Sequence, residues 1–117
     1  MAAGKYGLDH LVAIIDRNGL QISGSTEDVM SLDDLARKYQ DFGWHTAVCD
    51  GHDSDAIYRA VTTRVPGKPT VVIARTQKGY GSAVMQNRAD WHHRIPTDEQ
   101  YWQIRADFLR QANPGRG

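Results

Sequence analysis

The chain has 117 residues, of which 40% are hydrophobic and 24% are charged, an ordinary composition for a globular protein. Lysine plus arginine equals aspartate plus glutamate at 14 each, so no overall charge favours nucleic-acid or membrane partners. The longest apolar run, residues 11–15, is too short to span a bilayer, and the first residues contain no signal-peptide segment. The single Cys49 excludes an internal disulfide and fits a reducing compartment. We therefore expect at most one domain, located in the cytoplasm.

Three short apolar runs predict buried strands. They are rich in valine, isoleucine or threonine, and turn residues bound each of them. They span residues 11–16, 44–49 and 70–74.

Helical patterns separate these strands. Ser31 with Asp34 three residues later is typical of a capping box, and Gly43 is typical of a helix end. A second helix is expected to begin near Asp53 and to stop before Pro66. Its apolar residues, which should face the sheet, are Ile57, Ala60, Val61 and Val65.

A third helix is predicted from Thr97, which forms a capping box with Gln100, to about Ala112. Tyr101, Ile104 and Phe108 fall along one side of it, and residues 113–115 should end it.

This alternation of strands and helices predicts an α/β fold with a three-layer, mostly parallel sheet flanked by helices. Such sheets bind ligands beyond the carboxyl ends of their strands. We therefore expect functional residues within 16–24, 50–53 and 75–94. The last range includes a long stretch with little regular pattern, and such a connection is usually functional or disordered.

Residues 16–24 read Asp-Arg-Asn-Gly-Leu-Gln-Ile-Ser-Gly, directly after the first predicted strand. Taken alone, this is more often a turn, because Asp, Asn and Gly favour turns. The functional alternative is a magnesium site that uses the side-chain oxygen of Asn18 and the backbone carbonyl of Leu20, since magnesium prefers oxygen ligands.

Residues 50–53 read Asp-Gly-His-Asp, which favours a turn followed by a helix N-cap at Asp53. Residues 74–82 contain a glycine-rich loop that lets backbone approach a ligand closely, and Lys78 in it is either a phosphate contact or simply solvated. The adjacent His92 and His93 also suggest zinc, but no cysteine or further histidine stands at a suitable spacing.

These segments, in this order, resemble the transketolase family. That family has a strand followed by Asp-x-Asn, then Asp-Gly-His-Asp, then Arg-Thr-x-Lys-Gly-x-Gly and a histidine ahead of a proline and a helix. The resemblance covers about residues 1–112 and is closest to the carboxyl-terminal half of the short N-terminal subunit. It implies transfer of a two-carbon ketol unit from a ketose, such as a sugar phosphate, to an aldehyde or a specialised acceptor, with thiamine diphosphate and Mg²⁺ as cofactors.

The resemblance also implies roles for individual residues. Asn18 and Leu20 fall on the magnesium ligands, and His92 falls on a catalytic histidine near the thiazolium and the substrate. Histidine suits proton transfer at that place. The family usually has glycine after this histidine, whereas this chain has His93, which puts the standard substrate in doubt. The residues expected to contact the cofactor are Asn18, Leu20, Gln21, Gly81 and His92.

Two parts of the family's cofactor site are missing from this sequence. One is an upstream Gly-Asp-Gly with an aspartate that binds the metal, and the other is the pyrimidine domain with its glutamate. We therefore expect residues 1–117 to be a partial diphosphate domain, inactive alone, within a hetero-oligomer. Its partners would be an upstream fragment that carries Gly-Asp-Gly and a pyrimidine-domain subunit.

Two alternatives stay open. The chain fits a truncated reading frame, or a non-catalytic interaction or scaffold domain that kept the fold. A free-standing nucleotide-binding domain is disfavoured, because no Gly-x-Gly-x-x-Gly follows the first strand.

Overall fold

A computed structural model describes residues 1–112 of the chain, which divides into two compact units. The first unit comprises residues 1–18 and 31–76. The second comprises residues 19–30 and the chain from residue 77 onward.

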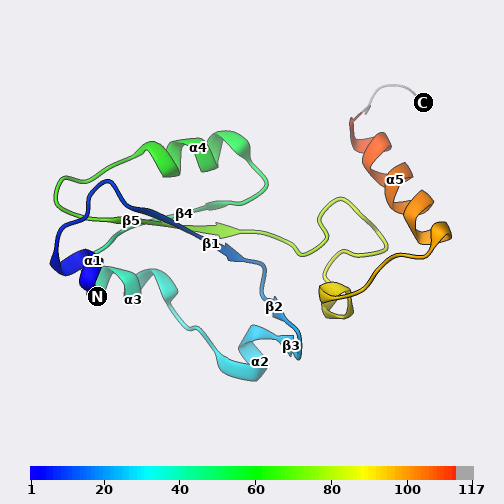
Figure 1. The fold of residues 1–117 in the computed structure, drawn as a ribbon, viewed down its shortest axis with the longest axis horizontal. Helices are drawn as coiled ribbons and strands as arrows, with labels where there is room; N and C mark the ends of the chain where they lie inside the picture. The colour runs from blue at the N-terminus through cyan, green and yellow to red at the C-terminus, as the bar shows by residue number, and fades with distance from the viewer. Residues whose placement is uncertain (113–117) are drawn as a thin grey trace. The chain divides into compact units, whose positions relative to one another are not determined.

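The first unit is a parallel sheet between helices. Strands β1 (Val12–Arg17), β4 (His45–Asp50) and β5 (Thr70–Arg75) pair in parallel in the order β1-β5-β4. Helices α3 (Leu35–Asp41) and α4 (Ser54–Thr62) lie on opposite faces of this sheet (Figure 1). The predicted three-layer α/β architecture is confirmed, and each predicted strand is correct to within one residue at either end.

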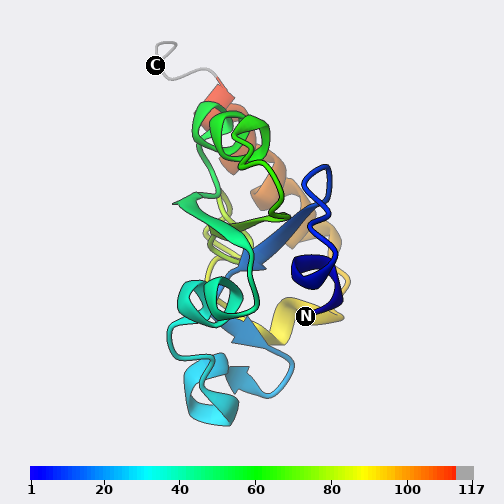
Figure 2. The ribbon, with the colours of Figure 1, turned by 90° about the vertical axis from the view of Figure 1, so that its left-hand side faces the viewer.

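The core of the first unit is β5. Residues Thr70 to Ala74 are all buried, and Val71 and Val72 have no exposed surface. Figure 2 shows β1 and β4 at the two sides of the sheet, so β5 lies between them. A strand enclosed in this way reads as a continuous apolar run, which is why the sequence predicts it well.

Helix α3 begins later than predicted. Asp34 is its N-cap, and the Asp34 carboxylate accepts a hydrogen bond from the Arg37 backbone N–H at 2.9 Å. The predicted capping role of Ser31 is therefore wrong, and the Ser31 hydroxyl instead contacts Asp33. Asp33 has a φ of +47°, which turns the chain before the helix can start. Gly43, with a φ of +84°, follows the helix end as predicted.

Helix α4 begins as predicted and ends sooner. The Asp53 carboxylate accepts hydrogen bonds from the backbone N–H groups of Asp55 and Ala56, at 2.9 and 3.0 Å. Ala60 is buried against the sheet. Val65 lies beyond the helix, in a β-bridge with Lys68, because the backbone becomes extended at Thr63, the C-cap. A short helix α1 (Ala2–Lys5) precedes β1.

The second unit opens with a small hairpin. Strands β2 (Leu20–Gln21) and β3 (Gly24–Ser25) are antiparallel, and helix α2 (Thr26–Met30) follows directly. The backbone N–H and the hydroxyl of Thr26 both donate to the Gly19 carbonyl, at 2.9 and 3.2 Å. Neither the hairpin nor α2 is predicted from the sequence, because elements this short carry little periodicity.

The rest of the second unit contains the 3₁₀ helix η1 (Ala89–His92) and helix α5 (Asp98–Ala112). The predicted capping box of α5 is confirmed. The Gln100 side-chain oxygen accepts from the Thr97 N–H at 3.1 Å, and the Thr97 hydroxyl accepts from the Gln100 N–H at 3.3 Å. Residues 113–115, expected to end this helix, lie outside the described residues.

Helix α5 holds the glycine-rich loop through polar contacts. The Asp107 carboxylate accepts from the Ala83 backbone N–H at 2.9 Å, and the Gln111 amide donates to the Gly81 carbonyl at 2.8 Å. Asp107 is only 5% exposed, whereas Tyr101 is 51% exposed. Asp107 is the buried residue of α5. The expected apolar side packs only in part, because Ile104 is half-buried and Phe108 lies beside Gly81, whereas Tyr101 is largely exposed.

We predict that adding a single methyl group at Gly51 destabilises the protein. A β-carbon there would lie 2.3 Å from the Thr76 methyl and 3.0 Å from the Arg75 carbonyl oxygen. We expect Gly51→Ala to lower the free energy of unfolding by about 1–3 kcal/mol, measured by urea denaturation. The matched control is the double variant Gly51→Ala/Thr76→Ser. When it is compared with Thr76→Ser alone, the stability lost through Gly51→Ala should be smaller, because the nearest methyl group is gone. An unchanged stability of Gly51→Ala would contradict this packing.

Asp107 should make the attachment of α5 sensitive to acid. Hydrogen bonding from the Ala83 N–H, helped by Gln103 and Arg110 and opposed by burial, lowers the pKa of Asp107. A lowered folded-state pKa stabilises the protein above the unfolded-state value of about 3.9, and this stability is lost as the pH falls through the folded-state pKa. NMR titration should therefore show the Ala83 amide shift changing with a midpoint below that value, and Asp107→Asn should abolish the change. A midpoint above it would contradict the contact.

Candidate functional site

The three parallel strands end at one level of the sheet. Arg17 of β1 lies opposite Arg75 of β5, and Arg75 lies opposite Asp50 of β4. Their carboxyl ends form a common edge, which is where ligands bind in sheets of this kind. All three segments predicted to be functional begin at this edge.

The end of β1 is tied to the residue that follows β5. The Thr76 hydroxyl donates a hydrogen bond to the Asp16 carboxylate. Asp16 is therefore engaged within the first unit. Asn18, the predicted magnesium ligand, follows two residues later and is half-buried just beyond the strand.

The segment after β4 has the structural roles that its sequence favours. The Asp50 carboxylate accepts from the His52 backbone N–H at 2.8 Å, which closes a turn. Asp53 caps α4, and the Gly51 N–H donates to the Arg75 carbonyl at 2.8 Å. His52 is exposed. The contacts of this segment fix the strand end, and we assign no chemistry to His52.

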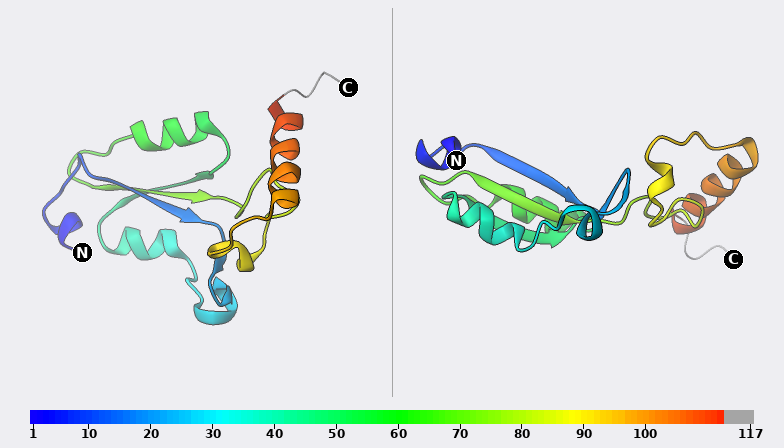
Figure 3. Two further views of the ribbon diagram at one scale, coloured as in Figure 1. Left: turned by 45° about the vertical axis from the view of Figure 1, so that its right-hand side comes forward. Right: turned by 90° about the horizontal axis from the view of Figure 1, so that it is seen from below.

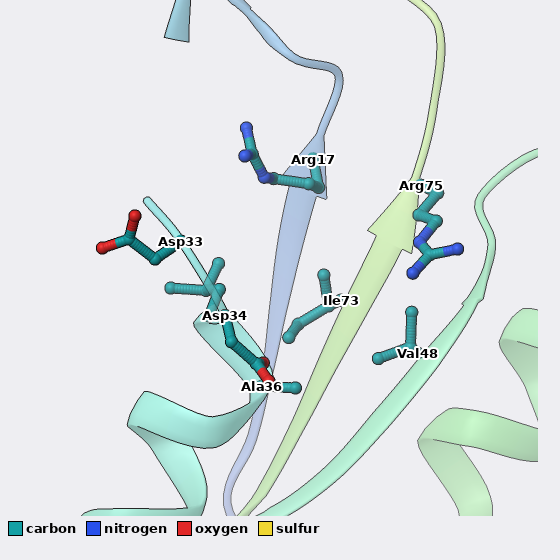
Figure 4. A pocket seen from close by; sticks show the side chains of 8 residues that line it. Arg17, Asp33, Asp34, Ala36, Val48, Ile73 and Arg75 are labelled. Atoms are coloured by element: carbon teal, nitrogen blue, oxygen red, sulfur yellow. The ribbon is translucent and has the colours of Figure 1, made fainter. Parts of the chain in front are cut away.

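A pocket of about 420 Å³ opens on the α3 side of this edge (Figure 4). Arg17 lines it from the end of β1 and Arg75 from the end of β5, and Asp33 and Asp34 lie at the start of α3. The sequence did not single out this pair of arginines, because only the sheet order brings β1 next to β5. The remaining lining residues are Leu35, Ala36, Val48 and Ile73.

The acidic groups of this pocket already have partners. The Ser31 hydroxyl donates to the Asp33 carboxylate at 2.8 Å and the Lys38 ammonium lies 3.2 Å from it, and together they lower the pKa of Asp33. Asp34 caps α3. Two guanidinium groups and two carboxylates therefore line the pocket, and its charge alone favours neither an anion nor a cation.

In the second unit, the hairpin lies against the histidine segment. Strand β2, which consists of Leu20 and Gln21, contacts η1, which ends at His92. The Gln21 side chain donates to the Ser23 hydroxyl at 3.2 Å. Three residues that the family resemblance assigns to the cofactor site are thus carried by neighbouring elements.

The buried Trp91 anchors the two histidines. His92 and His93 follow it and are both exposed, with ring centroids 4.6 Å apart and ring planes at 89°. The indole N–H of Trp91 is buried and has no acceptor among the described residues. The segment therefore exposes two imidazole rings next to a tryptophan that packing holds in place.

Positive charge flanks these histidines. The Asp90 carboxylate lies 3.1 Å from the Arg88 guanidinium and 3.0 Å from that of Arg94. Hydrogen bonding from Arg88 is the main cause of a lowered pKa of Asp90, with Arg94 adding to it and burial opposing it. Arg94 also stacks 5.3 Å from the centre of the Trp91 ring. With two arginines to one aspartate, the segment is suited to an anionic group.

Gly81 has a packing reason to be glycine. Its φ is +88°, and a β-carbon would lie 2.9 Å from both Phe108 and Gln111 of α5. This contact explains the residue without a cofactor, and a cofactor contact at Gly81 stays a prediction.

The predicted site residues come from both units. Asn18 belongs to the first unit, whereas Leu20, Gln21, Gly81 and His92 belong to the second. The contact between β2 and η1 lies within the second unit. A shared crevice lined by Asn18 and His92 stays a prediction.

The predicted ligands offer oxygen atoms of the type that magnesium prefers, but too few of them to fill its coordination shell. Asn18 offers a side-chain oxygen and Leu20 a backbone carbonyl, both suitable for a hard cation. Among residues 1–112, no cluster of three or more His, Cys, Asp or Glu side chains could hold a metal ion. A carboxylate from outside these residues, phosphate oxygens and water would have to complete the shell.

Comparison with known proteins identifies the family. Residues 1–111 match the family described as "Transketolase, thiamine diphosphate binding domain". The chain is 46% identical over 124 residues to an apulose-4-phosphate transketolase subunit of Phocaeicola vulgatus, covering 99% of the chain and 44% of that protein. It is 38% identical over 114 residues to the 6-deoxy-6-sulfo-D-fructose transketolase subunit SqwG of Clostridium sp., covering 96% of the chain and 42% of that protein.

A solved structure supports the fold. Transketolase from Campylobacter jejuni superposes with a TM-score of 0.77 at 21% identity, over 90% of this chain and 17% of that chain. None of the helices in residues 1–112 has the length and apolar character needed to cross a bilayer. The chain spans less than half the length of the two curated relatives. The sequence and the fold agree that this chain belongs to the transketolase family, through its thiamine-diphosphate-binding domain.

Proposed function

We propose that this chain is the diphosphate- and magnesium-binding part of a thiamine-diphosphate-dependent transketolase built from several polypeptides. It acts in the transfer of a two-carbon ketol unit from a ketose donor to an aldehyde or a specialised acceptor. The observation that carries the proposal is that three family motifs begin at the common carboxyl edge of β1, β5 and β4. A cytoplasmic location is part of the same proposal.

In this proposal, the residues of the chain bind, orient and move a proton. Asn18 and Leu20 bind Mg²⁺ through oxygen atoms, and Gln21 and Gly81 lie against the cofactor. When bound, thiamine diphosphate supplies a nucleophilic thiazolium carbon and stabilises negative charge on the ketol unit. His92 holds or moves a proton at the hydroxy-carbonyl end of the substrate, since imidazole can both donate and accept a proton near neutral pH.

The substrate in this proposal is a ketose that carries an anionic group. Two relatives are named for sugars that bear a phosphate or a sulfo group. In this chain, Arg88 and Arg94 flank the histidine segment, and both guanidinium groups lie near Asp90. His93 stands where the family has glycine, and this larger side chain favours a specialised substrate over an ordinary pentose phosphate.

The partners in this proposal supply what the sequence lacks. One is a fragment with the Gly-Asp-Gly aspartate, and the other is a pyrimidine-domain subunit with its glutamate. Both curated relatives are named as subunits, and the chain covers less than half of each.

The chain alone should bind the cofactor weakly. Asn18 and Leu20 leave most positions of the near-octahedral magnesium shell unfilled. Calorimetry with Mg²⁺ and thiamine diphosphate should therefore give a dissociation constant above about 1 μM, with no turnover of a ketose. In the assembled complex, Asn18→Ala should weaken Mg²⁺ binding at least about tenfold. Sub-micromolar binding by the chain alone would contradict the proposed division of the site.

The two histidines should have separable effects in the assembled enzyme. His92→Ala should lower kcat by about 10²–10⁴, because it removes a proton-transferring group. His93→Gly should change the ratio of KM values between an ordinary pentose phosphate and a sulfonated ketose, with a smaller effect on kcat. Both side chains are exposed, so circular dichroism should be unchanged. Full activity of His92→Ala would favour the non-catalytic alternative.

A further inference from the structure

The link between strands β1 and β2 contains an asparagine followed by a glycine. Asn18 and Gly19 lie between Arg17, the last residue of β1, and Leu20, the first residue of β2, and neither belongs to a helix or a strand. In the left-hand view of Figure 3, the chain that leaves β1 passes through this link into the hairpin. Both residues are half-buried, so solvent reaches them. Because glycine has no β-carbon, its backbone nitrogen is the least hindered one that an asparagine side chain can meet.

The contacts of Gly19 leave its backbone nitrogen accessible. The Gly19 carbonyl accepts hydrogen bonds from the backbone N–H and the hydroxyl of Thr26, at 2.9 and 3.2 Å. Among residues 1–112, these are the hydrogen bonds that Gly19 makes. Its φ is +74°, and no heavy atom outside its chain neighbours lies within 4 Å of the place where a β-carbon would stand. Gly19 is therefore held through its carbonyl, in open space.

Two comparable places in the chain differ in this respect. The N–H of the arginine that follows Asn87 donates to the Met85 carbonyl at 3.2 Å. The N–H of Gly51, which follows an aspartate, donates to the Arg75 carbonyl at 2.8 Å. A nitrogen that donates such a hydrogen bond has to give it up before it can attack a carbonyl carbon, which costs free energy. Of these three places, the link at Asn18 is the one suited to ring closure.

We propose that Asn18 is a site of spontaneous deamidation, in which its carboxamide becomes a carboxylate through a succinimide ring that includes the backbone nitrogen of Gly19. The inference rests on the local geometry of this link and is independent of the proposed function. The modification needs neither a partner enzyme nor a cofactor.

The reaction balances with water as its co-reactant. The Gly19 nitrogen loses its proton and bonds to the side-chain carbonyl carbon of Asn18, and the side-chain nitrogen leaves as ammonia. Water then adds to one of the two ring carbonyls. Opening of the newly formed bond gives aspartate, whereas opening of the original peptide bond gives isoaspartate, in which the main chain runs through the former side chain. One water is consumed and one ammonia is released, with no oxidation or reduction.

Both products change the chain just beyond β1. A carboxylate at residue 18 adds negative charge two residues after Asp16, whose carboxylate accepts a hydrogen bond from Thr76. The isoaspartate product also inserts a methylene group into the main chain next to Gly19, so the contacts of the Gly19 carbonyl with Thr26 have to shift. Under the proposed function, the reaction replaces a neutral oxygen ligand of magnesium by a charged one. An aged preparation is then a mixture of chains that differ at residue 18.

Peptide mass spectrometry tests the proposal on the full chain, kept for weeks at neutral pH without cofactor. A lysine-specific protease releases Asn18 in peptide 6–38 and Asn87 in peptide 79–117, and fragment ions locate the modified residue. Asn18 should gain the mass difference between NH₂ and OH at least about tenfold faster than Asn87. The product should separate into aspartate and isoaspartate forms, and the Asn18→Asp variant provides the aspartate standard. Equal rates at the two asparagines, or an unmodified Asn18, would overturn the proposal.

A methyl group beside the attacking nitrogen provides an independent test. Gly19→Ala should slow the reaction at Asn18 at least about tenfold, because a β-carbon hinders the approach of the side chain. The matched control is Gly67→Ala, since Gly67 has a φ of +73° and equally open space but lies far from Asn18 in the sequence. It imposes the same backbone strain and should leave the rate at Asn18 unchanged. Circular dichroism checks that both variants stay folded.

The result is overturned if Gly19→Ala leaves the rate at Asn18 unchanged, or if Gly67→Ala slows it equally. No cofactor is present in either experiment, so a failed catalytic function would leave both results unchanged.

Discussion

The pairing of β5 with β1 on one side and β4 on the other is the interaction on which the first unit depends. It encloses the apolar run of β5 and sets the register that brings Arg17, Arg75 and Asp50 to one level. A shift of one residue in either pairing would turn every side chain of a strand to the opposite face. The position of the candidate site is thus a consequence of how the Thr70–Ala74 run is buried.

Much of this architecture is predictable because its signals are local. The apolar runs and the turn residues that bound them identify the strands, and side-chain caps identify the starts of α4 and α5. The start of α3 is less predictable, since the positive φ of Asp33 displaces the cap from Ser31 to Asp34. The burial of Asp107 is not predicted, because the search for apolar positions passes over a carboxylate that accepts a hydrogen bond from a backbone N–H.

The candidate site is predictable only in its parts. The family resemblance indicates Asn18, Leu20 and His92, and the contact between β2 and η1 follows from folding of the second unit. The adjacent arginines 17 and 75 depend on sheet order, which no local signal encodes. The roles of the individual residues stay predictions, supported by their family.

The most direct test of a shared cofactor site uses manganese in place of magnesium in the assembled complex with thiamine diphosphate, since both ions favour oxygen ligands. A paramagnetic ion broadens the NMR signals of nuclei near it. We expect the Asn18 side-chain amide and the His92 ring both to be broadened, because the proposed function assigns both residues to the same cofactor. Broadening of Asn18 with an unaffected His92 would contradict this arrangement.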